Sequence, residues 1–486
     1  MARERPVQRR SVHHAQLGLL IGVGAGMALS LALTALLGRT LPGGDFGFFA
    51  LVSTIFLLTR TAIDLGAGNV VAREVTHAPS EEPHRLEELL GLRLVLAAIA
   101  AAGCAVAALA EDRPAHRLVL LAATLVLPLL CGGGLTVVFQ LRQAQFAAAL
   151  MNIGAQVAAL TVCGVLLMTG GPGWSFAAVA VGREAVVALG TWGLAAWMLG
   201  YVPQPSLNPA ALSRLARVAS GYGASALLYN LAFQNGLFFV FYLTSGAELG
   251  AFAAALRPIA PLVALPGAAL APLVPVLSAA THDDDLFRRQ VWGTLNLSIG
   301  VGAVVAAAGV VLAPAVVELL YGGRFLTGPL SAVPAFRWMA VALGCAFVIE
   351  AVAIVLLSER RERELLGIAA SMLGLSIAVT LLTVPRLGFV GAAGAMAVAG
   401  VAGALMGLAV VRRAGAQGRI TGSLAFLLPA AALGISIQMA PGPALVQVLA
   451  GVVLSLAALL VLWRMPGIAA YRAEQARLVV QGAVES

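Results

Sequence analysis

The residues of this chain best suited to chemistry are arginines placed inside long apolar runs. Arg257 is the clearest example, because no acidic residue lies within four positions of it and Pro258 follows at once. A charged side chain within a membrane is costly and is therefore a functional candidate. The planar guanidinium group matches phosphate oxygens with parallel hydrogen bonds. We predict that Arg257 binds an anionic substrate group such as a lipid-linked diphosphate, and that the following prolines bend or break its helix.

Other ionisable residues inside the apolar runs leave two interpretations open. Arg60 and Asp64 lie four residues apart, so they can pair along one helix face. Arg183 and Glu184 are adjacent and point in different directions, which predicts a separate partner for each, either in a cavity or on another helix. Glu350 lies deep in a later run and is predicted to bind a proton or an arginine. The candidates for coupling transport to an ion are Asp64, Glu184 and Glu350.

Polar side chains are concentrated in one run, 218–244, which contains Tyr222, Tyr229, Asn230, Gln234 and Asn235. These side chains suit a hydroxyl-rich substrate, but polar side chains also hold membrane helices together. Arg39 follows the first apolar run and is a second candidate for the anionic group, from the outer side.

Several functional classes lack support in the sequence. No glycine-rich loop ends in Lys-Ser or Lys-Thr, which argues against a built-in ATPase. The six histidines and four cysteines lack metal-ligand spacing. The net charge of +8 lies in segments between apolar runs, which indicates anionic lipid headgroups rather than nucleic acid. We therefore expect a protein that is not an enzyme and that uses no cofactor or metal.

Membrane-spanning helices must position these residues. Of the 486 residues, 60% are hydrophobic and only 11% are charged. The apolar runs reach the roughly 20 residues that cross a bilayer as a helix, and a helix satisfies its own backbone hydrogen bonds there. An all-α, polytopic membrane protein is therefore predicted. Its fourteen expected spans are 17–37, 46–70, 90–110, 118–140, 146–168, 174–199, 218–244, 249–279, 291–319, 335–357, 365–384, 388–411, 421–440 and 444–463.

The distribution of arginine predicts the orientation. All 30 basic residues are arginines. With the amino terminus in the cytoplasm, 21 arginines lie in inside segments, 6 lie in outside segments, and Arg60, Arg183 and Arg257 remain within spans. The positive-inside rule therefore predicts that both termini are cytoplasmic. The tail 465–486 is expected to be cytoplasmic or interfacial.

Two short motifs recur about two hundred residues apart. The segment 43–50 matches 246–253 at an offset of 203, and 173–178 matches 388–393 at an offset of 215. Six spans separate the members of each pair, and an even number predicts a parallel repeat with a cavity between the lobes. The expected divisions are an N-terminal lobe of helices 1–6 (1–200), a C-terminal lobe of helices 7–12 (201–417), and helices 13–14 with the tail (418–486).

Motifs in the right order resemble the polysaccharide-transport (O-antigen flippase) family. They are the segment 39–51, Asp64-Leu65-Gly66 with Arg73-Glu74, the stretch 257–278, Leu-Tyr-Gly-Gly-Arg-Phe at 320–325, and the glycine-rich element 385–393. The stretch 257–278 is also similar to the lipid II flippases. The resemblance covers roughly residues 17–411. It implies two six-helix lobes around a central cavity, within the superfamily that includes multidrug and toxin extrusion antiporters.

The resemblance also implies site residues. In these flippases cavity arginines engage the diphosphate of the substrate; Arg257 matches such a position, and Arg39 is a second match near the end of the first span. Two departures matter. The first span has no internal arginine, which weakens the lipid II interpretation, and no internal carboxylate, which weakens the antiporter interpretation. The seventh span has no acidic residue either, which further disfavours the antiporter.

The function expected from these features is translocation of an undecaprenyl-diphosphate-linked oligosaccharide across the bacterial inner membrane by alternating access, for surface polysaccharide biosynthesis. The alternatives are a lipid II flippase, a cation-coupled multidrug antiporter of the same superfamily, or a scaffold that transports nothing. The expected partners are a polyprenyl-diphosphate-linked glycan, the bilayer, and polysaccharide polymerase and ligase machinery, with no nucleic acid.

Overall fold

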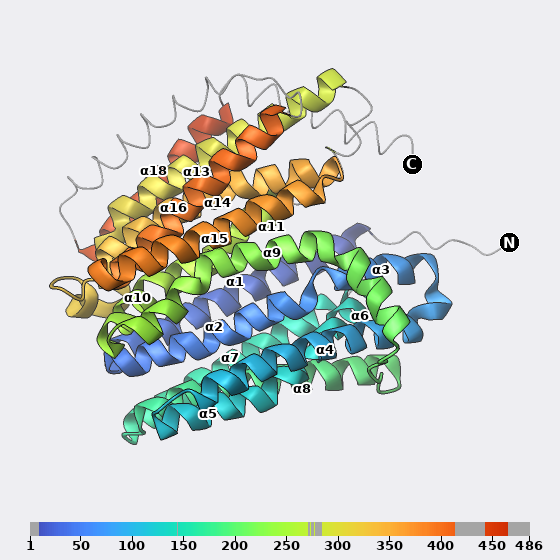
Figure 1. Cartoon of the computed structure of the whole chain (residues 1–486), viewed down its shortest axis with the longest axis horizontal. Helices are drawn as coiled ribbons and strands as arrows, with labels where there is room; N and C mark the ends of the chain where they lie inside the picture. Colours follow the sequence, from blue (N-terminus) through green and yellow to red (C-terminus); the bar gives the residue numbers. More distant parts are fainter. Residues whose placement is uncertain are drawn as a thin grey trace. The chain divides into compact units, whose positions relative to one another are not determined.

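The computed structural model describes residues 9–142, 144–270, 273, 277, 284–413 and 443–464. Within these ranges the regular structure is helical and no strand occurs (Figure 1). Eleven described helices are long and apolar enough to cross a membrane. The predicted all-α, polytopic class is therefore confirmed. The number fourteen stays a prediction, because eleven of these helices are found among the described residues and the predicted span 421–440 lies outside them, as does the tail 465–486.

The helices follow the predicted spans closely. The first half contains α1 (Arg9–Thr40), α2 (Gly43–Asp64), α3 (Ala67–His77), η1 (Pro79–Glu81), α4 (Glu82–Leu109), α5 (Pro114–Val126), η2 (Leu127–Leu135), α6 (Thr136–Leu141), α7 (Gln145–Met168) and α8 (Gly173–Leu199). The second half contains α9 (Pro209–Leu243), α10 (Gly246–Ile259), η3 (Ala260–Ala264), α11 (Leu265–Leu270), α13 (Asp284–Tyr321), η4 (Gly322–Phe325), α14 (Val333–Ser358), α15 (Glu362–Leu387), α16 (Phe389–Arg413) and α18 (Ala444–Arg464).

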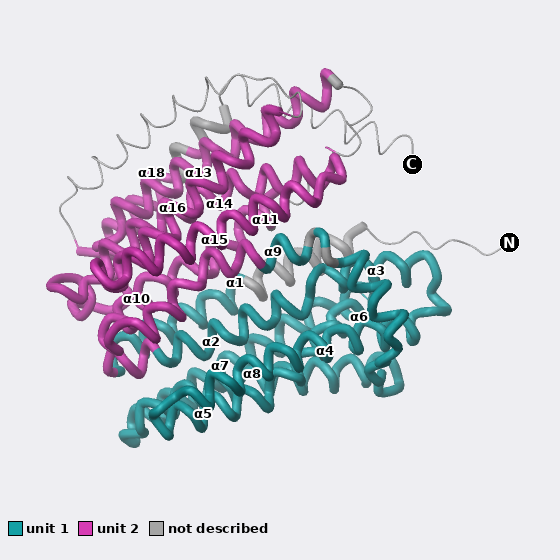
Figure 2. The backbone as a smooth tube through the Cα atoms, in the orientation of Figure 1, with its two compact units in different colours: residues 1–41, 48–227 teal, residues 42–47, 228–486 magenta. Residues whose placement is uncertain are grey.

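The chain divides into two compact units (Figure 2). Unit 1 comprises residues 1–41 and 48–227, and unit 2 comprises residues 42–47 and 228–486. The start of α2 therefore belongs to unit 2, and α9 passes from unit 1 into unit 2. The division predicted at residue 200, and the cavity predicted between the lobes, stay predictions.

Unit 1 contains a helix break that sets the position of Asp64. The predicted span 46–70 is two helices, because Leu65 and Gly66 adopt positive φ angles of 43° and 76° between α2 and α3. A positive φ is unfavourable for leucine and easy for glycine. A Cβ atom added to Gly223 of α9 would lie 2.0 Å from the carbonyl oxygen of Leu65. The backbone of α9 thus packs directly on the break, which ends α2 at Asp64.

Unit 2 contains the bend that the prolines predict. The α-helix α10 ends at Ile259, two residues after Arg257, and continues as the 3₁₀ turn η3 before α11 begins. Pro258 and Pro261 have no backbone N–H, so neither can donate the hydrogen bond that continues an α-helix. The expectation of a bent or broken helix is confirmed as a break in the α-helix, and Arg257 lies in the last turn of α10 before that break.

Small residues bring the helices of unit 2 into close contact. A Cβ atom on Gly302 of α13 would lie 2.3 Å from the carbonyl oxygen of Gly344 in α14, and one on Gly400 of α16 would lie 3.4 Å from the Cα of Ala342 in α14. Lipid tails are as apolar as leucine, so membrane helices associate through close packing of this kind. The glycines and alanines of the apolar runs therefore build a rigid frame around α14.

Candidate functional site

Three helices of unit 1 bring five charged side chains together. Arg60 of α2 donates a hydrogen bond to Oε2 of Glu184 in α8. The neighbouring Arg183 donates to Oε1 of the same carboxylate at 2.5 Å. Arg93 of α4 donates to Asp64 at the end of α2. Arg60 also lies within electrostatic range of Arg93 and Arg183, so we treat the five residues as the unit 1 charge cluster.

Two expectations about the partners of residues in this cluster are wrong. Arg60 and Asp64 do not pair along α2, because each bonds to a residue on a different helix. The partners Glu184 and Arg93 are 7% and 5% exposed, and a buried charge needs a counter-charge more than a half-exposed one does. Arg183 was also expected to find a partner elsewhere, yet it bonds to its own neighbour. Glu184 does have a distant partner, as predicted.

Arg93 is the functional candidate that the sequence did not reveal. Its position near the start of a predicted span placed it among the inside arginines, although it is almost completely buried. Its guanidinium and stem lie on Gly133 and Gly134 of η2, where a Cβ atom on Gly133 would lie 2.8 Å from Arg93 Nη2 and one on Gly134 would lie 2.9 Å from Arg93 Cδ, while the adjacent Gly132 faces Trp192. The triple glycine was the available signal, since it makes room for a large side chain.

The Asp64–Arg93 pair yields a stability prediction. Asp64→Asn should lower stability by about 3 kcal/mol, because it leaves a buried guanidinium without its counter-charge. The melting temperature of the detergent-purified protein measures this loss. The double variant Asp64→Asn with Arg93→Gln should recover most of it, since both charges are then absent. An unchanged melting temperature in the single variant would show that water, and not Asp64, solvates Arg93.

Unit 2 holds Arg257 beside a cluster of aromatic side chains. Tyr321 lies within electrostatic range of the Arg257 guanidinium and is 2% exposed. Its ring packs edge-on against Phe46 at 6.0 Å and against Phe325 at 5.6 Å between centroids. The Tyr321 hydroxyl is buried without a hydrogen-bond partner among the described residues. Arg257 thus lies next to a buried hydroxyl whose hydrogen-bonding capacity is unused within the part of the chain that the structure describes.

The sequence motifs of unit 2 meet one another at one end of the unit. The repeated segments at the starts of α2 and α10 are in contact, since a Cβ on Gly250 would lie 2.4 Å from the carbonyl oxygen of Gly43. Glu248, in the second copy, accepts a hydrogen bond at 3.1 Å from the backbone N–H of Phe389, in the glycine-rich element. Phe46 joins the first copy to Tyr321 at the end of α13 and to Phe325 in η4. These motifs therefore form a packing junction.

The polar residues of α9 in unit 2 divide between packing and a possible site. Asn235 donates to Ser376 of α15 at 3.0 Å, which joins two helices. Tyr229 packs against Phe233 at 4.7 Å between centroids and lies within electrostatic range of Glu350. The Glu350 carboxylate faces Gly267 of α11, and no hydrogen bond or ion pair to Glu350 occurs within the described residues. Glu350 and Tyr229 are the second polar feature of unit 2.

The remaining candidates are only partly placed. Gln234 is buried in α9, and Asn230 makes a polar or electrostatic contact of its own. The side chain of Tyr222 lies outside the described residues. Arg39 is exposed at the end of α1 in unit 1, whereas Arg257 belongs to unit 2. Their joint action on one anion stays a prediction.

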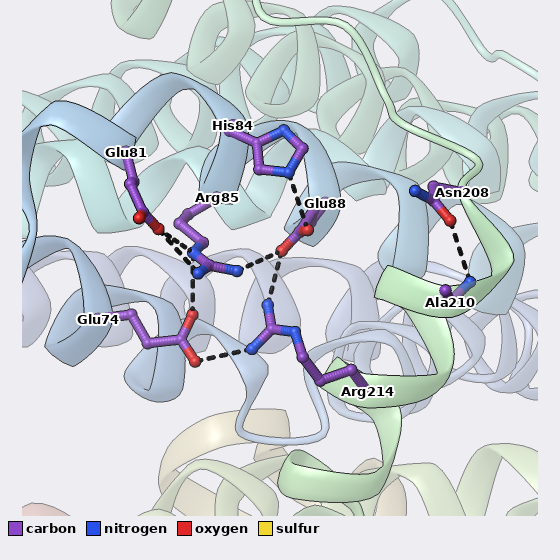
Figure 3. Close-up of polar contacts among 8 residues, drawn as sticks. All are labelled: Glu74, Glu81, His84, Arg85, Glu88, Asn208, Ala210 and Arg214. Carbon is purple, nitrogen blue, oxygen red and sulfur yellow. Dashed lines mark hydrogen bonds and ion pairs between the residues drawn. The ribbon is translucent and has the colours of Figure 1, made fainter.

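A second charge cluster of unit 1 was not anticipated (Figure 3). Arg214, near the start of α9, donates to Glu74 of α3 at 2.9 Å and to the buried Glu88 of α4 at 2.7 Å. Arg85 donates to Glu88 at 3.1 Å and to Glu81 at 3.0 Å. Burial alone would lower the pKa of Arg214, but its hydrogen bonds to Glu74 and Glu88 outweigh burial and raise that pKa above its usual value. This cluster fastens the start of α9 to α3 and α4.

Comparison with protein families gives a match over most of the chain. The model of a family described as polysaccharide biosynthesis protein matches residues 36–328. No curated protein sequence matches significantly. The matched range contains the unit 1 charge cluster, Arg257 and the packing junction up to Phe325.

Solved structures share the fold. The chain superposes on the lipid II flippase MurJ in an inward closed conformation with a TM-score of 0.73 and 12% identity, covering 92% of this chain and 98% of that chain. Superposition on an inward-facing multidrug resistance MATE family transporter of the MOP superfamily gives a TM-score of 0.54 with 16% sequence identity, covering 81% of this chain and 98% of that chain. Superposition on a MOP superfamily transporter from Pyrococcus furiosus gives a TM-score of 0.53 with 16% sequence identity, covering 84% of this chain and 94% of that chain. These likenesses establish the fold.

Proposed function

Because the chain belongs to the family of polysaccharide biosynthesis proteins, we propose that it is a flippase for an undecaprenyl-diphosphate-linked oligosaccharide, acting by alternating access in the bacterial inner membrane. The observation that carries this proposal is the excess of guanidinium groups over carboxylates in the spanning helices. The unit 1 charge cluster has three arginines against two acids, and in unit 2 Arg257 and Glu350 add one charge of each sign, which leaves four arginines against three acids. Such a surplus attracts an anionic headgroup.

The residues divide into proposed roles. Arg257, beside Tyr321, binds the diphosphate, and Arg39 assists from the outer side. The sugar contacts come from polar side chains of α9, namely Tyr222, Tyr229, Asn230 and Gln234. Arg60 and Arg183 bind the anionic group in unit 1. The carboxylates that couple transport to an ion are Asp64, Glu184 and Glu350, of which Glu350 has the fewest polar contacts. The protein transports and performs no covalent chemistry.

The proposed substrate makes transport sensitive to voltage. A negative diphosphate that moves outward from a negative interior gains about 2.3 kcal/mol per charge per 100 mV, so two charges gain at most about 4–5 kcal/mol at that voltage. We expect the initial flipping rate in proteoliposomes to rise when a potassium–valinomycin potential is made negative on the side from which the substrate leaves. A neutral lipid glycoside supplies the control, since its movement should not respond. A rate that is independent of voltage would mean that the charge does not cross the field.

Reconstitution tests the function itself. The purified chain is placed in vesicles with a fluorescent polyprenyl-diphosphate-linked oligosaccharide, and a glycosidase or a quencher outside reports the molecules that have crossed. The proposal predicts transport of this donor. Exclusive transport of lipid II would replace the proposal by the lipid II alternative. Cation-driven efflux of drugs without movement of the lipid would replace it by the antiporter.

The remaining expectations are also proposals. Both termini lie in the cytoplasm, and the polymerase and ligase of the same polysaccharide take up the translocated unit. Membrane-impermeant labelling of single cysteines introduced at exposed loop positions tests the orientation.

A further inference from the structure

Glu184 is the only carboxylate of the unit 1 charge cluster that two guanidinium groups share. Its Oε2 accepts from Arg60 and its Oε1 accepts from Arg183, so each oxygen faces one arginine. Neither arginine makes another ion pair within the described residues. A phosphate group also presents separate oxygens to two arginines. Glu184 thus accepts from both arginines, one for each oxygen, in the way that a phosphate group can.

The charge balance of the cluster leaves room for an anion. Arg60, Arg93 and Arg183 supply three positive charges, and Asp64 and Glu184 supply two negative charges. The Nε atoms of Arg93 and Arg183 are buried without hydrogen-bond partners among the described residues. An uncompensated charge among membrane helices is unfavourable unless water or an anion solvates it. The cluster is thus one negative charge short.

The two arginines that share Glu184 are partly exposed. The side chains of Arg60 and Arg183 are 38% and 23% exposed, whereas that of Glu184 is 9% exposed. On α8, Val186, Leu189 and Trp197 are exposed at helical spacing, whereas Glu184 lies among buried positions. The two guanidinium groups are thus more exposed than the carboxylate that they share.

We propose that Glu184 is an exchangeable counter-ion for the transported headgroup. In the empty protein it holds Arg60 and Arg183 in place. When a phosphate of a lipid-linked diphosphate arrives, its oxygens take over the hydrogen bonds of both guanidinium groups and the carboxylate moves aside. On release the carboxylate returns and displaces the phosphate, so that binding does not become a trap. The inference rests on the proposed function for the identity of the ligand.

Binding to the full chain in lipid nanodiscs tests this exchange. The probes are inorganic pyrophosphate and a polyprenyl diphosphate without sugar, and the variants are Glu184→Gln, Arg60→Gln and the control Glu318→Gln, whose carboxylate is exposed on α13. Removing the competing negative charge should make Glu184→Gln bind both probes about tenfold more tightly. Arg60→Gln should bind about tenfold less tightly. The control should match the wild type.

A purely structural ion pair gives the opposite result. If Glu184 only positions the arginines, Glu184→Gln weakens binding or leaves it unchanged, and the proposal is overturned. The proposal would also be overturned if polyprenyl diphosphate failed to compete with pyrophosphate for binding, because the site would then bind a soluble anion.

The wild-type chain gives an independent measurement if the variant does not fold. Displacement by a phosphate releases the Glu184 carboxyl from both guanidinium groups, so labelling of Glu184 by a hydrophobic carbodiimide should rise when pyrophosphate is added. Unchanged or reduced labelling contradicts the exchange. The two proposals fail separately. If the wild-type protein flips the lipid in vesicles but Glu184→Gln does not bind the probes more tightly, only the exchange is refuted. If Glu184→Gln binds more tightly but the wild-type protein does not flip the lipid, only the flippase proposal is refuted.

Discussion

Replacing Arg257 with alanine is expected to slow flipping of the lipid-linked oligosaccharide by about 10- to 100-fold. A hydrogen bond to a charged group contributes about 1.5–3 kcal/mol, and each 1.4 kcal/mol is a factor of about ten. The guanidinium lies in the last turn of α10, immediately before η3, beside the buried hydroxyl of Tyr321. Initial rates in proteoliposomes at equal protein incorporation measure the loss.

Arg386→Ala is the matched control for this experiment. Arg386 is an exposed arginine in the last turn of α15, in the same unit, and its removal should leave the rate within about twofold of the wild type, as for most exposed surface substitutions. The flipping rate of Arg257→Lys should lie between those of Arg257→Ala and Arg386→Ala, because lysine keeps the positive charge but lacks the planar guanidinium group. Wild-type rates for Arg257→Ala, with normal insertion, would remove Arg257 from the mechanism.

The helices were predictable because their signal is local. Each predicted span except 421–440 contains a described helix, since the length of an apolar run determines whether it can cross a bilayer. The bend after Arg257 was predictable for the same reason, because proline acts on its own helix. The break at Leu65 and Gly66 was not predictable from the sequence, because the positive φ of Leu65 depends on the backbone of α9 that packs against it.

The partners of the site residues depend on tertiary structure, and the sequence predicted them poorly. It correctly identified Arg60, Asp64, Arg183 and Glu184 as charges within the spanning helices, but the spacing of Arg60 and Asp64 suggested a local pair that does not form. Arg93 was missed because its position at a span edge is typical of a solvated arginine. Burial and the facing glycines, which decide its role, become visible only when η2 and α4 are packed together.

The motifs that carry the family resemblance have a structural explanation. In unit 2 the two copies of the repeated segment contact each other, the first copy contacts Tyr321 at the end of α13, and the second copy contacts the start of α16. Only glycine permits the approach of α10 to the start of α2. Gly250→Ala should therefore destabilise unit 2 by about 3 kcal/mol, because the added Cβ would lie 2.4 Å from the carbonyl oxygen and 2.6 Å from the Cα of Gly43. Backbone atoms cannot move aside as a flexible side chain can.

The expected result for Gly250→Ala is a melting temperature at least about 5 °C below that of the wild type in detergent. Gly374→Ala in α15 is the matched control, since no atom lies within 4 Å of its added Cβ. Alanine favours a helix over glycine by about 1 kcal/mol, so this control should be as stable as the wild type or slightly more stable. Equal stability of the two alanine variants would mean that the α2–α10 contact does not hold unit 2 together. A loss confined to Gly250→Ala would identify the repeated motif as a packing element, whose substitution affects transport only through the fold.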